Sequence, residues 1–303
     1  MDTHAGIVTL AGRPNAGKST LLNRLIGEHL AIMSAKPQST RERVVGLLSD
    51  ATSQMMLLDT PGLLDPAYEL QRSMRAASLR ALHEADVIVH VVDAVNAEPE
   101  ALGAAANLAT PPSAPILIAL NKADALPARL RDTVRADHRD SVLISALTGE
   151  GVQEVLARIR GLLPESPFLF PPEDLSTQHL RFFAREMIRE AALELLSEEL
   201  PYSVACAIEE YREESTPVYI RAVLYVERES QKGIVIGARG ERIRELGTRA
   251  RAKMEGLVGG QVFLDLQVRV LKNWRRDPAA LARLGYAMEP DAARLDRPSG
   301  ARS

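Results

Sequence analysis

The sequence has few of the residues that mark an extracellular or membrane-embedded chain. It contains a single cysteine, Cys206, in 303 residues, which excludes a disulfide within the chain. Its six histidines show no spacing typical of metal ligands. The longest apolar runs, such as Val87–Val92, are far too short to cross a bilayer, and the first residues lack the charged and then apolar pattern of a signal peptide. We therefore expect a cytoplasmic protein in which Cys206 is a buried apolar residue.

The remaining composition is that of an ordinary globular chain. Aromatic residues make up only 4%, hydrophobic residues 46% and charged residues 25%, with a formal net charge of −3. The length leaves room for two domains, each large enough to bury its own core. Composition therefore excludes a disordered or fibrous protein and leaves the function to the motifs.

A phosphate-binding loop lies near the amino terminus. Residues 12–19 read Gly-Arg-Pro-Asn-Ala-Gly-Lys-Ser, after an apolar strand at 7–11 and before a helical pattern at 20–26. Glycines let backbone N–H groups converge on phosphate oxygens, Lys18 reaches the β- and γ-phosphates, and the Ser19 hydroxyl ligates magnesium. The nucleotide-binding residues expected here are Asn15, Ala16, Gly17, Lys18, Ser19 and Thr20.

A second motif, Asp-Thr-Pro-Gly at 59–62, ends the apolar strand expected at 54–58. This places Asp59 at the carboxyl edge of a sheet, where nucleotides bind. We expect Asp59 to hold magnesium and the Gly62 N–H to meet the γ-phosphate, so that this loop senses whether the phosphate is present. In isolation the same four residues would indicate an ordinary turn, and the order of the motifs favours the functional interpretation.

A third motif reads the base. Asn121-Lys122-Ala123-Asp124 follows an apolar strand at 115–120. The Asp124 carboxylate can accept from both the ring N–H and the exocyclic amine of guanine, and adenine offers neither donor. Ser145 and Ala146 close the next strand, where a backbone N–H is placed to contact the guanine O6. Together with Asn121 and Lys122, these residues predict a pocket for guanine nucleotides rather than ATP.

The polar segment from Ser34 to Arg41 lacks clear periodicity and is expected to be the nucleotide-sensing switch. Thr40 is the predicted second hydroxyl ligand of magnesium, with Ser39 as the alternative. Lys18, Thr40 and Gly62 are the predicted catalytic groups. Leu63 follows Gly62, where many GTPases carry a glutamine that orients the attacking water, so we expect slow unaided hydrolysis that depends on backbone groups, a monovalent cation or a partner.

The pattern of elements predicts two domains. Alternating strand and helix patterns, with later helices expected at 101–109, 129–137 and 152–163, indicate a three-layer α/β domain with a mostly parallel sheet in residues 1–165. A proline-rich linker stiffened by its prolines and pinned by its aromatic residues follows at 166–177. An α+β domain is expected at 178–286, and the polar tail at 287–303 is expected to be disordered.

The second domain carries its positive charge in one block. Residues 171–230 contain 6 basic and 13 acidic residues, whereas residues 231–276 contain 11 basic and 4 acidic residues. The basic block includes a Gly-x-x-Gly loop at 237–240 between two helical patterns, and the order helix, strand, strand, helix, helix, strand is that of a type II KH domain. The RNA-binding residues expected in this clamp are Lys232, Ile234, Ile236, Gly237, Ala238, Arg239, Gly240, Arg242 and Ile243.

With one GTPase domain, a proline-rich linker and a KH domain ending in the residues from Val268 to Tyr286, the chain resembles the Era family of bacterial GTPases over residues 5–286. The resemblance implies GTP and GDP with Mg²⁺ as ligands, K⁺ bound through Asn15, and binding to the 3′ end of 16S ribosomal RNA. It further implies a role in assembly of the 30S subunit and peripheral association with the inner face of the cell membrane. We also expect a monomer.

Three other classes of protein share parts of these motifs. An ATPase or kinase shares the phosphate loop but is opposed by Asp124, and a simple RNA-binding protein has no need of the nucleotide motifs. A tandem GTPase with a terminal KH-like domain is excluded because the sequence has one phosphate loop. A GTP-regulated protein that binds a different RNA remains the alternative function.

Overall fold

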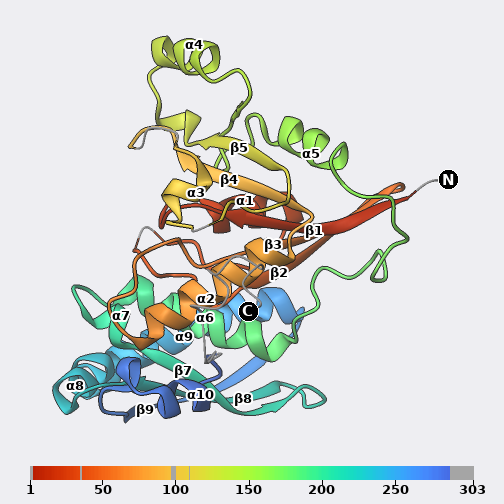
Figure 1. The fold of residues 1–303 in the computed structure, drawn as a ribbon. Coiled ribbons are helices and arrows are strands. Elements are labelled where there is room, and N and C mark those ends of the chain that lie inside the picture. The colour runs from red at the N-terminus through yellow and green to blue at the C-terminus, as the bar shows by residue number, and fades with distance from the viewer. Residues whose placement is uncertain (1–2, 35, 97–99, 109, 287–303) are drawn as a thin grey trace, which may run out of the picture.

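Two sheets organise the computed structural model, which describes residues 3–34, 36–96, 100–108 and 110–286. Figure 1 shows the larger sheet in the upper part of the molecule and the smaller one in the lower part. The expected tail at 287–303 lies outside the described residues. Within the described ranges, no helix is both long and apolar enough to cross a membrane.

The larger sheet has the order β2-β3-β1-β4-β5-β6. Only β2 is antiparallel to its neighbour, and the other neighbouring strands pair in parallel. Parallel strands covered on both faces read as continuous apolar runs, as β1 and β4 do here. The strands are β1 (His4–Ala11), β2 (Val44–Ser49), β3 (Ser53–Asp59), β4 (Val87–Asp93), β5 (Ile116–Asn121) and β6 (Val142–Leu143).

Helices cover both faces of this sheet. Val89 of β4 packs in one core cluster with α1 (Lys18–Ile26) and α5 (Val152–Arg160), whereas its neighbour Ile88 packs in another with α2 (Glu69–Glu84) and α3 (Leu102–Ala105). Because successive strand residues point to opposite faces, the two helix pairs lie on opposite sides. This confirms the expected three-layer α/β domain with a mostly parallel sheet.

Two expected helices are shorter than their sequence patterns. The helix expected at 101–109 is confined to α3, because Asn107 adopts a left-handed φ of 48°. The helix expected at 152–163 ends at Arg160, before Gly161. The helix expected at 129–137 is confirmed as α4 (Ala128–Asp137). It follows η1 (Ala123–Ala125), projects from the domain and has no buried residue.

The second unit has the predicted KH order. A three-stranded sheet pairs β7 and β8 antiparallel and β8 and β9 in parallel, which is the type II arrangement. Short elements that the periodicity did not predict, α7, η3 and α10, flank this core. The elements are α6 (Leu180–Leu195), α7 (Leu200–Ser203), β7 (Ala205–Arg212), β8 (Val218–Val226), α8 (Glu229–Ile236), η2 (Ala238–Gly240), α9 (Glu241–Val258), β9 (Val262–Val270), η3 (Trp274–Arg276) and α10 (Pro278–Arg283).

The segment that connects the units runs along the edge of the larger sheet. The Gln54 carboxamide accepts from Leu169 N (2.7 Å) and Phe170 N (3.0 Å) and donates to Phe170 O (2.8 Å). Further along, Leu47 N donates to Leu175 O (2.8 Å). A side-chain amide and the backbone of β2 therefore anchor this segment.

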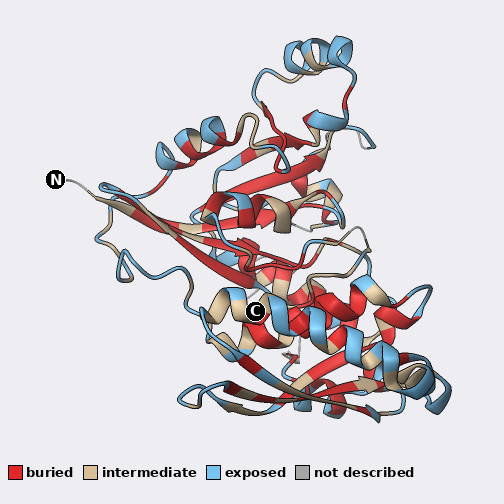
Figure 2. Ribbon diagram, turned by 180° about the vertical axis from the view of Figure 1, so that it is seen from behind, coloured by how far each residue is buried: buried red, intermediate tan, exposed pale blue. Residues whose placement is uncertain are grey.

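The two units share a buried junction. Leu70 and Met74 of α2 pack in one cluster with Trp274, Leu281 and Tyr286, and Trp274 stacks on Tyr286 at a centroid distance of 6.1 Å. Figure 2 shows buried residues on the helices and strands of both units, including the helices that lie where the units meet. The nucleotide motifs of the first unit and the core of the second are thus parts of one packed structure.

Candidate functional site

The phosphate loop turns between β1 and α1, and its glycines are required by close packing. Gly12 has a φ of 145°, and a Cβ there would lie 2.2 Å from Val91 O. The Lys18 ammonium donates to Gly12 O (3.1 Å) and Arg13 O (3.0 Å), so that it lies across the loop. Burial lowers the pKa of Lys18 to about 8, and Asp59 opposes the shift. An anionic ligand in the loop would favour the charged ammonium.

Three side-chain oxygens converge beside the loop. Ser19 Oγ donates to Asp59 Oδ2 (2.7 Å) and lies 3.0 Å from Thr40 Oγ1, which itself lies 3.2 Å from Asp59 Oδ2. Asp59 is fully buried, burial raises its pKa, and its Oδ1 has no hydrogen-bond partner in the described part of the chain. An all-oxygen set with a buried carboxylate fits Mg²⁺. Ser39 instead uses its carbonyl to accept from Arg189.

The loop that contains Gly62 touches the phosphate loop directly. A Cβ on Gly62 would lie 2.6 Å from Pro14 N, and Leu63 N donates to Gly12 O (3.1 Å). Leu63 itself is buried against Leu82 and Ile88. The Leu63 side chain therefore has no means of orienting a water, as the sequence predicts.

The base-reading residues are linked to the phosphate loop by Asn121. Its Nδ2 donates to Ala16 O (2.8 Å) and its Oδ1 accepts from Ala146 N (2.9 Å). Asp124 accepts from Ser145 Oγ, and Lys122 forms a 2.6 Å ion pair with Asp93. The Ala146 N–H is thus already used inside the protein, whereas the following residue, Leu147, is exposed.

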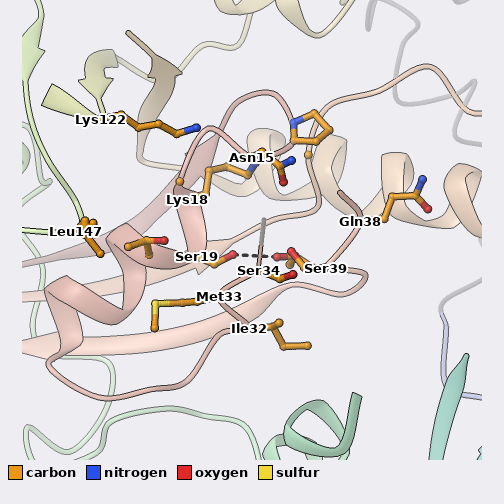
Figure 3. Close-up of a pocket in the computed structure, with 15 residues that line it drawn as sticks. Asn15, Lys18, Ser19, Ile32, Met33, Ser34, Gln38, Ser39, Lys122 and Leu147 are labelled. Atoms are coloured by element: carbon orange, nitrogen blue, oxygen red, sulfur yellow. Dashed lines mark hydrogen bonds between the residues drawn. The ribbon is translucent and has the colours of Figure 1, made fainter. Parts of the chain in front are cut away.

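A cavity of about 480 Å³ lies beside the phosphate loop, and Asp124 and Ser145 are not among the residues that line it. Figure 3 shows Lys122 and Leu147 on one side, Gln38 on the other, and the hydrogen bond of Ser19 between them. Periodicity gave no signal for several wall residues, because they lie in irregular loops. The cavity is lined by Pro14, Asn15, Gly17, Lys18, Ser19, Thr20, Ile32, Met33, Ser34, Gln38, Ser39, Thr40, Gly62, Lys122 and Leu147. Buried Asp59, Asn121 and Ala146 support the site through the contacts above.

The glycine loop of the second unit lies between α8 and α9. Gly237 has a φ of 73°, and a Cβ there would lie 2.7 Å from Arg242 Cβ. Side chains from α9 hold the loop: Arg242 donates to Ile234 O (2.8 Å), and Arg244 donates to Arg239 O (2.8 Å) and Gly240 O (3.1 Å). Arg244 was not among the predicted residues, although it belongs to the basic block.

Much of the basic block is neutralised by the acidic one. Lys253 forms ion pairs with Glu190 and Glu194, both at 2.9 Å, and Arg275 pairs with Glu227 at 2.6 Å. Four cations at the glycine loop make no ion pair with any described residue; these are Lys232, Arg239, Arg242 and Arg244. Unpaired positive charge is therefore concentrated where a phosphate backbone would approach.

Apolar side chains lie next to these cations. Ile234 is 49% exposed, and Ile236 and Ile243 are partly buried against the core. Ala238 is exposed at the tip of the loop. The structure thus brings the residues predicted for RNA binding together on one helix-loop-helix unit, with apolar surface beside positive charge.

Comparisons with known proteins agree with this geometry. Residues 7–122 match the 50S ribosome-binding GTPase family and residues 199–275 match the KH domain family. The chain is 40% identical over 298 residues to GTPase Era of Carboxydothermus hydrogenoformans, covering 94% of this chain and 99% of that protein. The chain belongs to the Era family of GTPases.

Solved structures of Era extend the similarity to the arrangement of both units. The crystal structure of Era in complex with MgGDPNP and nucleotides 1506–1542 of 16S ribosomal RNA has a TM-score of 0.87 and 37% identity, covering 94% of this chain and 100% of that one. A variant of Aquifex aeolicus Era bound to GDP·AlF4⁻ has a TM-score of 0.87 and 36% identity over the same shares. Both sites described above thus belong to an Era-type architecture.

Proposed function

We propose that the chain is a GTP-hydrolysing molecular switch that binds single-stranded RNA at the 3′ end of 16S ribosomal RNA and assists assembly of the 30S subunit. The single observation that carries the proposal is that one packed chain holds both a magnesium-type oxygen cluster at Ser19, Thr40 and Asp59 and unpaired cations at a glycine loop. We propose residues 1–165 as the GTPase unit and 178–286 as the RNA-binding unit, with 166–177 between them.

In this proposal each nucleotide group has a matching protein group. Mg²⁺, held by Ser19, Thr40 and Asp59, would neutralise charge on the phosphates. Lys18 leaves its two carbonyl partners to meet the β- and γ-phosphates. The Gly62 N–H reads the γ-phosphate, and Asp124 reads the guanine edge. Ser145 orients Asp124 by donating to its carboxylate, and Asn121 fixes the position of Ala146 by accepting from its N–H.

At the position after Gly62 the pocket has no side chain that can orient the attacking water, because Leu63 is buried and apolar. We propose that K⁺ bound through Asn15 supplies part of the missing charge stabilisation, and that turnover without a partner is slow. Asn15 is exposed at the outer turn of the phosphate loop and has a left-handed φ of 62°. The similarity to the Era family supports the choice of a monovalent ion.

On the RNA-binding side, Lys232, Arg239 and Arg242 would contact phosphates while Ile234 and its neighbours contact unstacked bases. The similar Era structure that contains 16S ribosomal RNA supports the choice of target. Family membership is the support for action on the 30S subunit as a monomer in the cytoplasm, with peripheral membrane association. A different RNA target is the alternative.

The RNA clamp is tested by replacing Ala238 and Arg239 together with aspartate. The matched control replaces Arg251 and Ala252, an exposed pair on α9, with the same two aspartates. We expect the loop variant to lose binding of a single-stranded RNA carrying the 16S 3′-terminal sequence, and the control to retain it, while both still bind GDP. Equal RNA affinity of the two variants would contradict the clamp, and equal affinity of the parent for an unrelated RNA would favour the alternative target.

Guanine recognition is tested by Asp124→Asn. The amide offers a donor where xanthine carries a carbonyl, so we expect GTP affinity to fall and XTP affinity to rise. Sites that hydrogen-bond a specific edge typically discriminate by about 10⁴-fold or more. Asp132→Asn, at a side chain that is 90% exposed on α4, is the control. Calorimetric titration that finds comparable GTP and ATP affinity in the parent would contradict the guanine pocket.

A further inference from the structure

The base loop, defined here as residues 145–149, reaches the nucleotide cavity through Leu147. Leu147 lines the cavity and is 65% exposed. Figure 3 shows it on the same side of the cavity as Lys122 of the base-reading motif. Because a backbone N–H of this loop is proposed to meet the guanine O6, the direction in which each N–H points affects which base is selected.

Most N–H groups of the base loop are already used inside the protein. Three of the four N–H groups of residues 146–149 donate to neighbouring groups; these are Ala146 N to Asn121 Oδ1 (2.9 Å), Thr148 N to Ser145 Oγ (3.1 Å) and Gly149 N to Ser145 O (2.8 Å). The Leu147 N–H makes no hydrogen bond to any residue in the described part of the chain. It is therefore the donor that this loop can offer to a base in the cavity.

Arg24 holds the opposite side of the same peptide group. Arg24 lies in the last turn of α1, and its Nε donates to Ala146 O (3.2 Å) while its Nη2 donates to Leu147 O. In a planar trans peptide unit the C=O and the following N–H point in opposite directions. The contact to Ala146 O therefore directs the Leu147 N–H away from α1.

Other contacts fix the two ends of the base loop. Ser145 N donates to Glu150 O (2.9 Å), and the Glu150 carboxylate pairs with Arg131 of α4 at 3.2 Å. Rotation of the peptide group before Leu147 is the motion that these contacts leave to Arg24. Because Arg24 is an exposed side chain, we expect its contacts to affect the orientation of this peptide more than the stability of the fold.

We propose that Arg24 is a positioning residue for guanine recognition, which holds the carbonyls of Ala146 and Leu147 from α1 and thereby presents the Leu147 N–H to the O6 atom of the base. This deepens the proposed function and rests on it. A cation beside the carbonyl also polarises the peptide group, which strengthens its N–H as a donor. Since α1 begins at Lys18 in the phosphate loop, one helix would position both the phosphate end and the base end of the nucleotide.

The experiment removes the guanidinium and varies the base. Arg24→Gln is compared with Arg158→Gln, an exposed arginine of α5 that donates to the Asp140 carbonyl (3.2 Å) rather than to the base loop. Dissociation constants are measured with Mg²⁺ for three diphosphates. GDP carries O6 and the exocyclic amine, IDP keeps O6 without the amine, and 2-aminopurine riboside diphosphate keeps the amine without O6.

We expect Arg24→Gln to weaken GDP and IDP by about fivefold each, the effect of losing one hydrogen bond of ordinary strength. The 2-aminopurine nucleotide should weaken by less than about twofold, because it has no O6 to meet the oriented N–H. Arg158→Gln should change none of the three. Equal weakening of all three nucleotides by Arg24→Gln would indicate a general structural role and overturn the proposal, as would an unchanged GDP affinity.

Failure of the proposed function would give a different result, namely a parent protein with comparable affinity for GDP and ADP. A second measurement identifies the donor directly, by following the Leu147 amide resonance in protein labelled with ¹⁵N-leucine. In the parent, GDP and IDP should move the Leu147 amide proton downfield relative to the 2-aminopurine nucleotide, and the difference should be smaller in Arg24→Gln. The same Leu147 amide shift with all three nucleotides would refute the proposal.

Discussion

Asn121 offers the sharpest test of how the nucleotide pocket is held together, because one buried carboxamide joins two loops. Asn121→Ala removes the donor to Ala16 O and the acceptor for Ala146 N, at 2.8 Å and 2.9 Å. Asn121 is 2% exposed, so water has little access to the groups left behind. Each buried polar group without a partner costs about 1–3 kcal/mol, which gives a total loss of about 2–4 kcal/mol if the backbone partly relaxes.

The assay is urea unfolding of the nucleotide-free protein, together with GDP titration of the folded protein. We expect the free energy of unfolding to fall by this amount and GDP affinity to fall as well, because the phosphate loop and the guanine-reading loop lose their fixed spacing. The control is Thr148→Ala, an exposed residue of the same loop as Ala146, with an expected change below about 0.5 kcal/mol. An Asn121→Ala protein as stable as this control, with unchanged GDP affinity, would refute the reasoning.

Two other predictions concern pH and potassium. Burial lowers the pKa of His90 to about 4; Glu100 opposes this shift and Lys18 reinforces it. The pKa of histidine in the unfolded chain is near 6.5, so the unfolded chain takes up the proton first as the pH falls. The free energy of unfolding therefore decreases as the pH falls from about 6.5 towards 4. The loss between pH 7.5 and pH 5 should be about 2 kcal/mol smaller in His90→Gln than in the parent, and equal losses in urea unfolding would contradict it. GTP turnover should be faster in K⁺ than in Na⁺ at matched ionic strength, and Asn15→Ala should remove the difference; a variant that keeps the full response would exclude Asn15 as the ligand.

The sequence alone was sufficient to propose which groups meet the nucleotide. The proposed contacts to phosphate, magnesium and guanine come from short contiguous segments, so the chemistry of residues 12–19, 59–62 and 121–124 can be inferred without knowing the fold. The order of elements in both units was predictable for a related reason, since periodicity and turn residues are local properties. The ends of elements, such as the end of α3, were less predictable from the sequence. One left-handed residue, Asn107, terminates that helix.

Contacts between segments far apart in the chain were decided by the tertiary structure. Arg41 reads as a polar residue of a mobile loop, yet it is buried beneath Trp274 and caps α7. The geometry also favours Thr40 over Ser39 at the magnesium cluster, because the Ser39 carbonyl contacts Arg189 while the Thr40 hydroxyl lies 3.0 Å from Ser19.

The sequence predicts where charge is concentrated along the chain, whereas the tertiary structure decides which charges pair. Counting residues identifies a basic block at 231–276 and an acidic one at 171–230, but not which charges neutralise each other. The fold places Lys253 against Glu190 and Glu194 and leaves the cations of the glycine loop without an acidic partner among the described residues. The chemistry of a site can therefore be inferred from adjacent residues in the sequence. The burial of a side chain and the pairing of charges depend instead on how the whole chain packs, because both require partners that only folding brings within a few ångströms.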